Sequence, residues 1–286
     1  MVQNSKVQNY LAQTIATKLS GFLGTKVNVG NVHIDMLNRL VIRDLYVEDL
    51  KHDTLLFTKK LTLSVEAVNI SKKIIRVEKI ELSKAFINFY IDSAKVINLQ
   101  FFINKISGDT ANKKKGWDII FNNIGLIDSR FALQNQVKNK VDSGINFTNL
   151  KLDSLNIRIK NLVTENHITS LKINKLFFKE QCGFIVNNLS AKMSLRQNFM
   201  HFDDLRIYTP SSEIDAPKVH FDFPKFKAFS HFAQKVNINF VFNSSASSLS
   251  EIAYFEPGLW GLKEKFELVG TVKGKLNNLR CKKIKI

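Results

Sequence analysis

The segments Leu61-Thr-Leu-Ser-Val65 and Val219-His-Phe-Asp-Phe223 place an apolar side chain at every second residue. Successive side chains of a β-strand point to opposite faces, so this period of two predicts strands with one apolar and one polar face. The alternation recurs with few interruptions from Val27 to the end of the 286-residue chain. We therefore expect a mainly β fold.

Small polar residues typical of turns separate these stretches at intervals of roughly 8 to 14 residues. Connections of this length are too short for crossover helices, so we expect mostly antiparallel neighbours and not a parallel α/β fold. An extended apolar face also needs a cover. The alternatives are two packed sheets, a closed barrel, or a long curled open sheet whose inner face meets lipid acyl chains.

Residues 7–23 follow a different period. Their apolar positions lie one, three or four residues apart, which indicates one side of a helix; they are Val7, Tyr10, Leu11, Ile15, Leu19, Phe22 and Leu23. We expect an N-terminal amphipathic helix within residues 1–26 and the sheet over residues 27–286. Such a helix packs on a sheet as a lid or lies on a membrane surface. Short helices are predicted over 94–106, 226–234 and 249–255.

A weak internal echo runs through the middle of the chain. It appears as Asn123-Ile-Gly-Leu-Ile-Asp-Ser129, Asn149-Leu-Lys-Leu-Asp-Ser154, Asn188-Leu-Ser190 and Asp204-Leu-Arg-Ile207. Each copy pairs a small polar residue with Leu or Ile, at unequal spacings. We interpret these copies as repeated rungs of a sheet, because a solenoid would keep a fixed period.

The composition bears on partners. Lys and Arg number 42 against 25 acidic residues, a formal net charge of +17, which favours an anionic partner. Only 8 of these bases are Arg, the residue that preferentially forms bidentate contacts to bases and phosphates. We therefore expect no nucleic acid, and instead weak attraction to anionic membranes. The 23 Phe outnumber 2 Trp and 5 Tyr, which fits a dry lining or a packed core.

Motifs that carry catalytic chemistry are missing from the sequence. The six His residues are scattered singly, and the two Cys residues, Cys182 and Cys281, form no CxxC pair. The sequence contains no HExxH, GxSxG, GxxxxGK[ST] or GxGxxG motif. We expect a non-enzymatic protein with no catalytic residues, metal site or cofactor. No apolar stretch is long enough for a membrane span or resembles a signal peptide.

Several stretches resemble the N-terminal part of bacterial TamB proteins in their Bacteroidetes-like form, which belong to the AsmA-like group. They include Val7-Gln-Asn-Tyr-Leu-Ala12, Leu23-Gly-Thr-Lys-Val-Asn-Val-Gly30, Leu40-Val-Ile-Arg-Asp-Leu-Tyr-Val-Glu-Asp49 and Asp204-Leu-Arg-Ile-Tyr-Thr-Pro-Ser-Ser-Glu-Ile214. The resemblance implies a curled β-groove with a hydrophobic inside, standing in the periplasm and associated with the inner membrane.

The activity implied by the resemblance is phospholipid transport between the inner and outer membranes. The alternative is a scaffold for assembly or secretion of outer-membrane proteins, with a BamA- or TamA-like barrel as partner. The family's anchor helix would precede Val7 and its C-terminal half would follow Ile286, so we expect a truncated form.

The acyl chains would contact apolar side chains of the alternating stretches, each of which is equally compatible with an ordinary core. The candidate positions are Leu61, Leu63, Val65, Ile87, Phe89, Leu155, Ile157, Ile159, Val219, Phe221, Phe223, Val236, Ile238 and Phe240.

Overall fold

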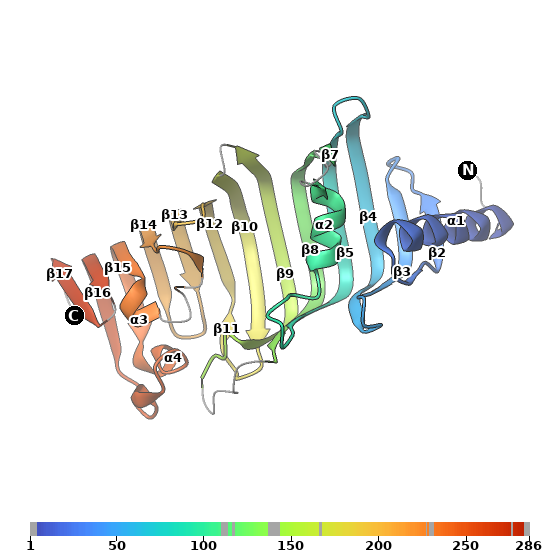
Figure 1. The fold of residues 1–286 in the computed structure, drawn as a ribbon. Coiled ribbons are helices and arrows are strands. Elements are labelled where there is room, and N and C mark those ends of the chain that lie inside the picture. The colour runs from blue at the N-terminus through green and yellow to red at the C-terminus, as the bar shows by residue number, and fades with distance from the viewer. Residues whose placement is uncertain are drawn as a thin grey trace. The chain divides into compact units, whose positions relative to one another are not determined.

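The computed structural model describes residues 5–109, 114–115, 118–136, 144–165, 168–226, 228, 232–275 and 277–282 (Figure 1). Strands contain 63% of the residues and helices 13%, so the mainly β prediction is confirmed. The chain forms two compact units. Unit 1 comprises residues 1–141 and 146–156, and unit 2 comprises residues 142–145 and 157–286.

Fifteen strands form one open, mostly antiparallel sheet, as the turn spacing predicts. Their order is β1-β3-β4-β5-β8-β9-β10-β12-β13-β14-β15-β16-β17, with β2 paired to β3 and β11 to β10. Strands β6 (Gly108–Asp109) and β7 (Lys114–Lys115) pair separately. Unit 1 contains β1 (Val27–Asn28), β2 (Asn31–Ile34), β3 (Leu40–Glu48), β4 (Thr54–Asn69), β5 (Ile74–Ile91), β8 (Asp118–Asn135) and the first half of β9 (Asn149–Glu165).

One pairing in unit 1 is parallel, which short connections do not allow. Strand β8 runs beside β5 from Ile74↔Asp118 to Ile91↔Asn135. The chain leaves β5 at one end and returns to the other through the segment that carries α2 (Gln100–Ser107). Parallel neighbours require such a crossover. The predicted helix over 94–106 therefore belongs to the connection that sets this pairing.

Helix α1 (Ser5–Leu23) packs on one face of unit 1. Its Ala12 and Leu23 are buried in a cluster with Val32, Ile42 and Leu45 from β2 and β3. Phe89 on β5 and Phe101 and Phe102 on α2 pack against the same cluster. The helix therefore lies over the side of the sheet that the alternating apolar residues define.

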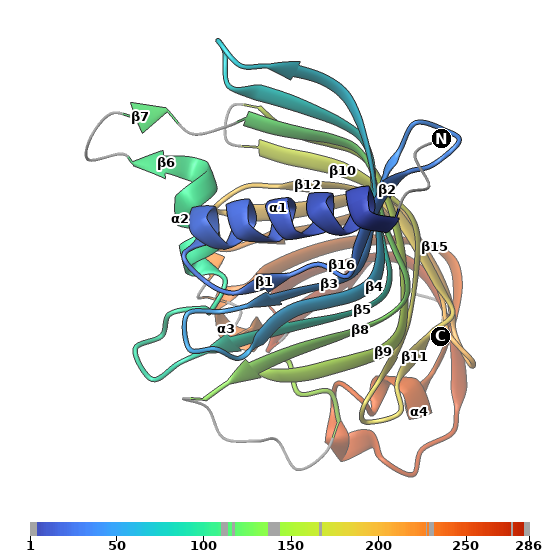
Figure 2. The ribbon, with the colours of Figure 1, turned by 90° about the vertical axis from the view of Figure 1, so that its right-hand side faces the viewer.

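A row of residues in left-handed conformation crosses unit 1. Asp44, Lys84, Asp128 and Ser154 have φ angles of 50°, 50°, 46° and 52°. Each of the first three interrupts a regular register; Asp44, for example, falls between the pairs Arg43↔Lys60 and Leu45↔Thr58. Bulges of this kind bend a strand and increase its twist. Figure 2 shows that β4, β5 and β8 bend along their length.

Buried hydroxyl groups satisfy the backbone groups that these interruptions leave unpaired. The Ser129 Oγ accepts from the Ala85 N–H at 3.1 Å and donates to the Ile127 carbonyl at 3.0 Å. The Thr58 Oγ1 lies 3.1 Å and 3.0 Å from two carbonyl oxygens, those of Lys60 and Ser83. Both hydroxyl-bearing residues are fully buried. Ser129 thus satisfies a buried N–H at one bend, whereas the Thr58 hydroxyl contacts carbonyl oxygens at another.

Unit 2 is an antiparallel meander that also contains a left-handed residue and a buried hydroxyl group. It contains β10 (Ile168–Glu180), β11 (Ile185–Val186), β12 (Asn188–Leu195), β13 (Phe199–Tyr208), β14 (Glu213–Asp222), β15 (Asn237–Ser248), β16 (Lys265–Lys275) and β17 (Asn278–Lys282). Asp204 is left-handed with φ of 54°, and the register shifts between Ser190 and Lys192 on the neighbouring strand. The buried Ser245 Oγ accepts from the Asp215 N–H at 2.9 Å.

Short helices lie at both ends of strand β15 in unit 2, before it and after it. They are α3 (Phe232–Lys235), α4 (Leu249–Ile252) and the 3-10 helix η2 (Pro257–Leu259), near the predicted ranges 226–234 and 249–255. The Glu251 carboxylate accepts from Thr209 Oγ1, Ser211 N and Ser212 Oγ at 2.5, 2.9 and 2.5 Å. These bonds hold α4 against the β13–β14 turn.

Candidate functional site

One face of unit 1 carries apolar side chains in register across three strands. Leu61 pairs with Leu82 on β5, which pairs with Leu126 on β8. Beyond the bend, Phe89 and Phe131 meet edge to face with ring centroids 5.6 Å apart. We call these rows the apolar face of unit 1, which consists of Leu61, Leu63, Ile80, Leu82, Ile87, Phe89, Ile124, Leu126, Phe131 and Leu133.

Every member of that face is only half-buried. Helices α1 and α2 pack against Leu61 and Phe89 at one side, through the cluster that also contains Ile42 and Leu45. The remaining members are therefore partly open to solvent although they lie side by side. Large apolar patches that stay exposed are, in proteins generally, sites of contact with other molecules.

Unit 2 presents a corresponding surface built on aromatic rings. Phe202 on β13, Phe221 on β14, and Phe240 and Phe242 on β15 contact one another edge to face. Their successive centroid separations are 6.4, 5.2 and 5.9 Å. We call these four rings the Phe ladder. All four are half-buried, over the smaller buried residues Ala191, Leu205, Ala216 and Val219.

Helices provide little cover for the ladder. In the part of unit 2 that the structure describes, each helix has four residues or fewer. A second small cluster, which includes Phe223, Val236 and Ile238, packs at the α3 end and reaches the ladder at Phe221 and Phe240. The four rings of the ladder thus pack against buried residues on one side, and protein atoms cover their other side only in part.

The predicted lining residues divide by burial. Leu61, Leu63, Ile87, Phe89, Ile157, Ile159, Phe221 and Phe240 are half-buried, and Val65 is 46% exposed. The buried ones are Leu155, Val219, Phe223, Val236 and Ile238. Phe202, Phe242 and Phe131 belong to the same surfaces but were not among the predicted positions. The strand register places these residues beside the predicted ones, as in the pair Phe202↔Val219, and alternation in the sequence does not predict the register.

The opposite, polar face carries two pockets at the bends. In unit 2 a pocket of about 540 Å³ is lined mainly by polar groups, including Lys172, Lys192, Asp204, Arg206 and Asp215. The Lys192 Nζ lies 2.8 Å from Asp204 Oδ2, and this hydrogen bond lowers the pKa of the Asp204 carboxyl. A smaller pocket of about 290 Å³ in unit 1 includes Lys84, Asp128, Arg130 and Asp153 in its lining.

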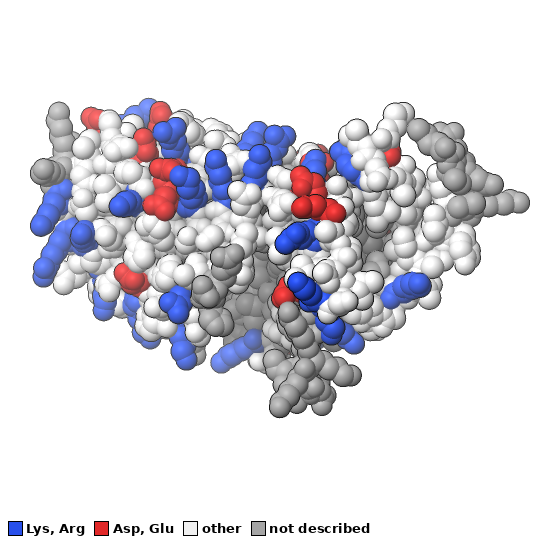
Figure 3. Space-filling model, turned by 90° about the horizontal axis from the view of Figure 1, so that it is seen from above, with Lys and Arg blue, Asp and Glu red and all other residues white. Residues whose placement is uncertain are grey.

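Charges of both signs mix on the polar surfaces. Figure 3 shows Lys and Arg dispersed over the view from above, with Asp and Glu between them. Cys182 and Cys281 are both free thiols. Burial raises the pKa of the Cys182 thiol to about 11, with a further contribution from Glu180. This environment disfavours the reactive thiolate form.

Two of the six His residues meet in space, which their separation in sequence does not suggest. His201 and His220 stand directly opposite each other on β13 and β14. The signal that could have found them is a repeated tripeptide, His-Phe-Asp, at 201–203 and 220–222. In the described segments, no three His, Cys, Asp or Glu side chains are grouped so that they could hold a metal ion together.

Comparison with known proteins assigns no family. The sequence matches no protein-family model, and no curated protein is significantly similar to it. None of the helices among the described residues is long and apolar enough to cross a membrane. The TamB-like resemblance therefore remains a prediction from the quoted stretches.

Proposed function

We propose that this protein is a non-enzymatic carrier surface for phospholipid acyl chains, which contributes to phospholipid transport between the inner and outer membranes of the bacterial envelope. One observation carries the proposal. The apolar face of unit 1 and the Phe ladder of unit 2 are each a contiguous, half-buried apolar surface on the strands of its own unit. The TamB-like resemblance of the sequence supports the same function independently.

The proposed activity depends on the burial of acyl chains and needs no covalent chemistry. An acyl chain that lies along an apolar face leaves water, which contributes about 0.8 kcal/mol per methylene. The phosphate headgroup would stay in solvent, because burying an unpaired charge is costly. In this proposal the bent strands form the sides of a groove, and α1 is an amphipathic helix that covers one part of it.

A clamped hairpin supports a membrane contact. At the β2–β3 turn, Met36 is 87% and Leu37 71% exposed. The Asp35 carboxylate accepts from Arg39 Nε and Nη2 at 2.8 and 2.6 Å and from the Leu37 N–H at 3.0 Å. The Arg39 hydrogen bond lowers the pKa of Asp35 to about 2, so the clamp is ionised at neutral pH. A fixed turn that presents two apolar side chains is suited to insertion into lipid.

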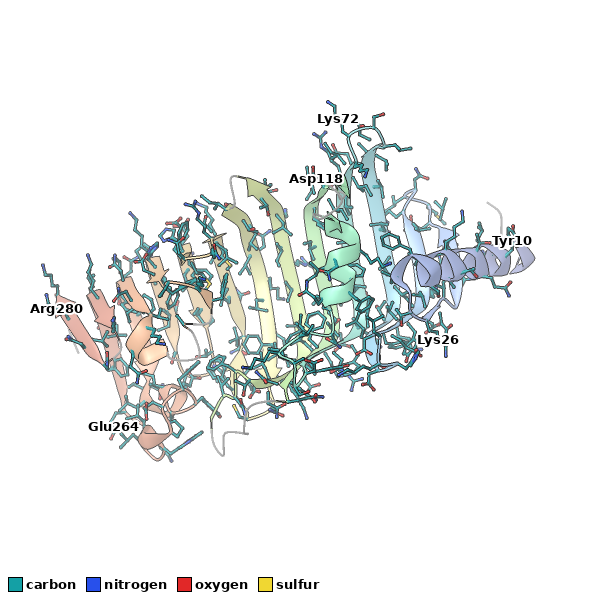
Figure 4. The ribbon with its side chains drawn as sticks, viewed as in Figure 1. Tyr10, Lys26, Lys72, Asp118, Glu264 and Arg280 are labelled. Carbon is teal, nitrogen blue, oxygen red and sulfur yellow. The ribbon has the colours of Figure 1, made fainter. Side chains whose placement is uncertain are left out.

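The β4–β5 hairpin offers a similar tip. Val68 and Ile70 are 56% and 76% exposed there, and Lys72 lies at its end (Figure 4). Basic residues beside apolar ones add attraction to anionic headgroups of about 1 kcal/mol each. Both hairpins belong to unit 1, which is the part we propose to contact the inner membrane.

The test uses the two faces of one sheet. A photoreactive phenylalanine analogue replaces Phe221 or Phe240 on the ladder, and Phe57 or Phe86 as matched controls. Phe57 and Phe86 are half-buried like the ladder, but Lys59 and Arg130 lie over their rings. After illumination with phospholipid vesicles, we expect lipid adducts at 221 and 240 and at most a tenth as many at 57 and 86. Equal labelling at all four positions would refute the proposal.

The scaffold alternative also has one observation in its favour. Strand β17 ends the strand order, and every side chain from Asn278 to Lys282 is exposed. An open strand edge can pair with a strand of another protein. If the vesicles also carry outer-membrane proteins, adducts with those proteins instead of with lipid would favour this alternative.

A further inference from the structure

The repeated tripeptide places two imidazoles and two carboxylates in one row. Because strand side chains alternate, each His and Asp share the polar face while Phe202 and Phe221 point into the ladder. His201 pairs with His220 across the antiparallel β13–β14 ladder. The two copies are thus related by the local symmetry of antiparallel pairing, with the rings adjacent at the centre.

The hydrogen bonds orient both rings. His201 Nε2 lies 2.9 Å from Asp203 Oδ1, and His220 Nε2 lies 3.0 Å from Asp222 Oδ1. A carboxylate oxygen accepts hydrogen bonds, so the two Asp side chains suit the ring tautomer that carries its proton on Nε2. The two Nδ1 atoms then face each other, 3.1 Å apart. In that tautomer the lone pairs of both Nδ1 atoms converge on one point between the rings, which is the arrangement that a shared ion needs.

We propose that the Nδ1 atoms of His201 and His220 bind one divalent transition-metal ion of the Zn²⁺, Ni²⁺ and Cu²⁺ class. With metal–nitrogen distances of about 2.05 Å, two nitrogens 3.1 Å apart subtend an angle of about 98° at the ion. That value lies between square-planar and tetrahedral angles, which these ions accept.

The carboxylates supply the outer contacts that such ligands usually have. A metal-binding His commonly donates its other N–H to a carboxylate, which fixes the ring and makes the nitrogen more basic. Here Asp203 and Asp222 do this for both rings. Imidazole nitrogens select late transition metals, whereas Ca²⁺ and Mg²⁺ require oxygen ligands.

The site is open enough to be loaded and completed by water. The side chains of His201 and His220 are 27% and 30% exposed. Opposite His220 on β15 stands Asn239, whose buried Oδ1 has no hydrogen-bond partner within the described structure. An ion with bound water brings hydrogen-bond donors to this row. Two protein ligands predict micromolar rather than structural-site affinity.

The location couples this site to the Phe ladder. Phe202 and Phe221 are the middle residues of the two tripeptides, so an ion on the polar face joins the strands that carry the first two rings. This inference does not depend on the lipid proposal, because it rests on groups of the opposite face.

Calorimetric titration with Zn²⁺ tests the site in the full chain, with Cys281→Ser to remove an exposed thiol ligand. We expect one ion per chain, at least tenfold weaker binding after His201→Gln or His220→Gln, and no change after His33→Gln. The double change Asp203→Asn and Asp222→Asn should weaken binding about tenfold while keeping one site.

Copper gives a second measurement that a purely structural role of the pair would not produce. With one equivalent of Cu²⁺, we expect electron spin resonance to show coupling to two imidazole nitrogens, and His33→Gln to retain it. Far-UV circular dichroism confirms that each variant folds. Unchanged Zn²⁺ affinity in folded His201→Gln and His220→Gln, or no equivalent bound in the parent chain, would overturn the proposal.

Discussion

Substitution of Ser129 by Ala tests how the bends in unit 1 are stabilised. The hydroxyl is fully buried between β5 and β8, where it accepts from the Ala85 N–H and donates to the Ile127 carbonyl. Alanine fits the same space but removes both bonds. The buried N–H of Ala85, a residue only 2% exposed, then has no partner in place of the hydroxyl.

The expected cost follows from that orphaned donor. Leaving one buried backbone N–H unsatisfied lowers the free energy of unfolding by about 1–3 kcal/mol. The same free energy corresponds to roughly 5- to 150-fold faster exchange of the Ala85 amide with solvent deuterium, if exchange reports the opening equilibrium. Because the effect is local to unit 1, peptides from unit 2 should keep their protection.

Hydrogen–deuterium exchange with mass spectrometry measures this change directly. Ser170→Ala is the control, because its exposed hydroxyl makes only a 3.5 Å contact with Ser194 Oγ. We expect the control to alter stability by less than about 0.5 kcal/mol. Unchanged protection of the peptide that contains Ala85 in the Ser129→Ala variant would refute the reasoning about the bends.

Two further predictions follow from the same structure. Asp128 is left-handed with φ of 46°, so Asp128→Gly should change the stability little, because relief of the strained conformation offsets the flexibility of Gly. Asp128→Val should instead lower the free energy of unfolding of unit 1, measured in urea, by at least about 1–2 kcal/mol. Equal stability of the two variants would contradict this prediction. At pH 8, iodoacetamide should alkylate the exposed Cys281 before Cys182, because the pKa of the Cys182 thiol is about 11 and the thiol stays protonated until the pH approaches that value. Equal labelling rates of the two thiols, measured by mass spectrometry, would count against the buried environment of Cys182.

The weak internal repeat of the sequence coincides in part with left-handed residues of the structure. Three of the four copies, Asn123–Ser129, Asn149–Ser154 and Asp204–Ile207, contain a left-handed residue, respectively Asp128, Ser154 and Asp204. The fourth, Asn188–Ser190, contains none, and a register shift follows it between Ser190 and Lys192. Short polar side chains tolerate this conformation better than bulky ones. These three copies therefore mark where strands bend, which the alternating period alone does not reveal.

The sequence by itself determined the strands and which side of each is apolar, because side-chain alternation is a local property of extended backbone. It also determined that turns are short and that most neighbours are antiparallel. Only the tertiary structure decided which strands meet, since register depends on hydrogen bonds between residues far apart in the chain. Ser129 reaches Ala85 across 44 positions, and His201 reaches His220 across 19. The Phe ladder, the buried hydroxyls and the paired imidazoles all depend on that register, so local patterns could name their residues but could not bring them together.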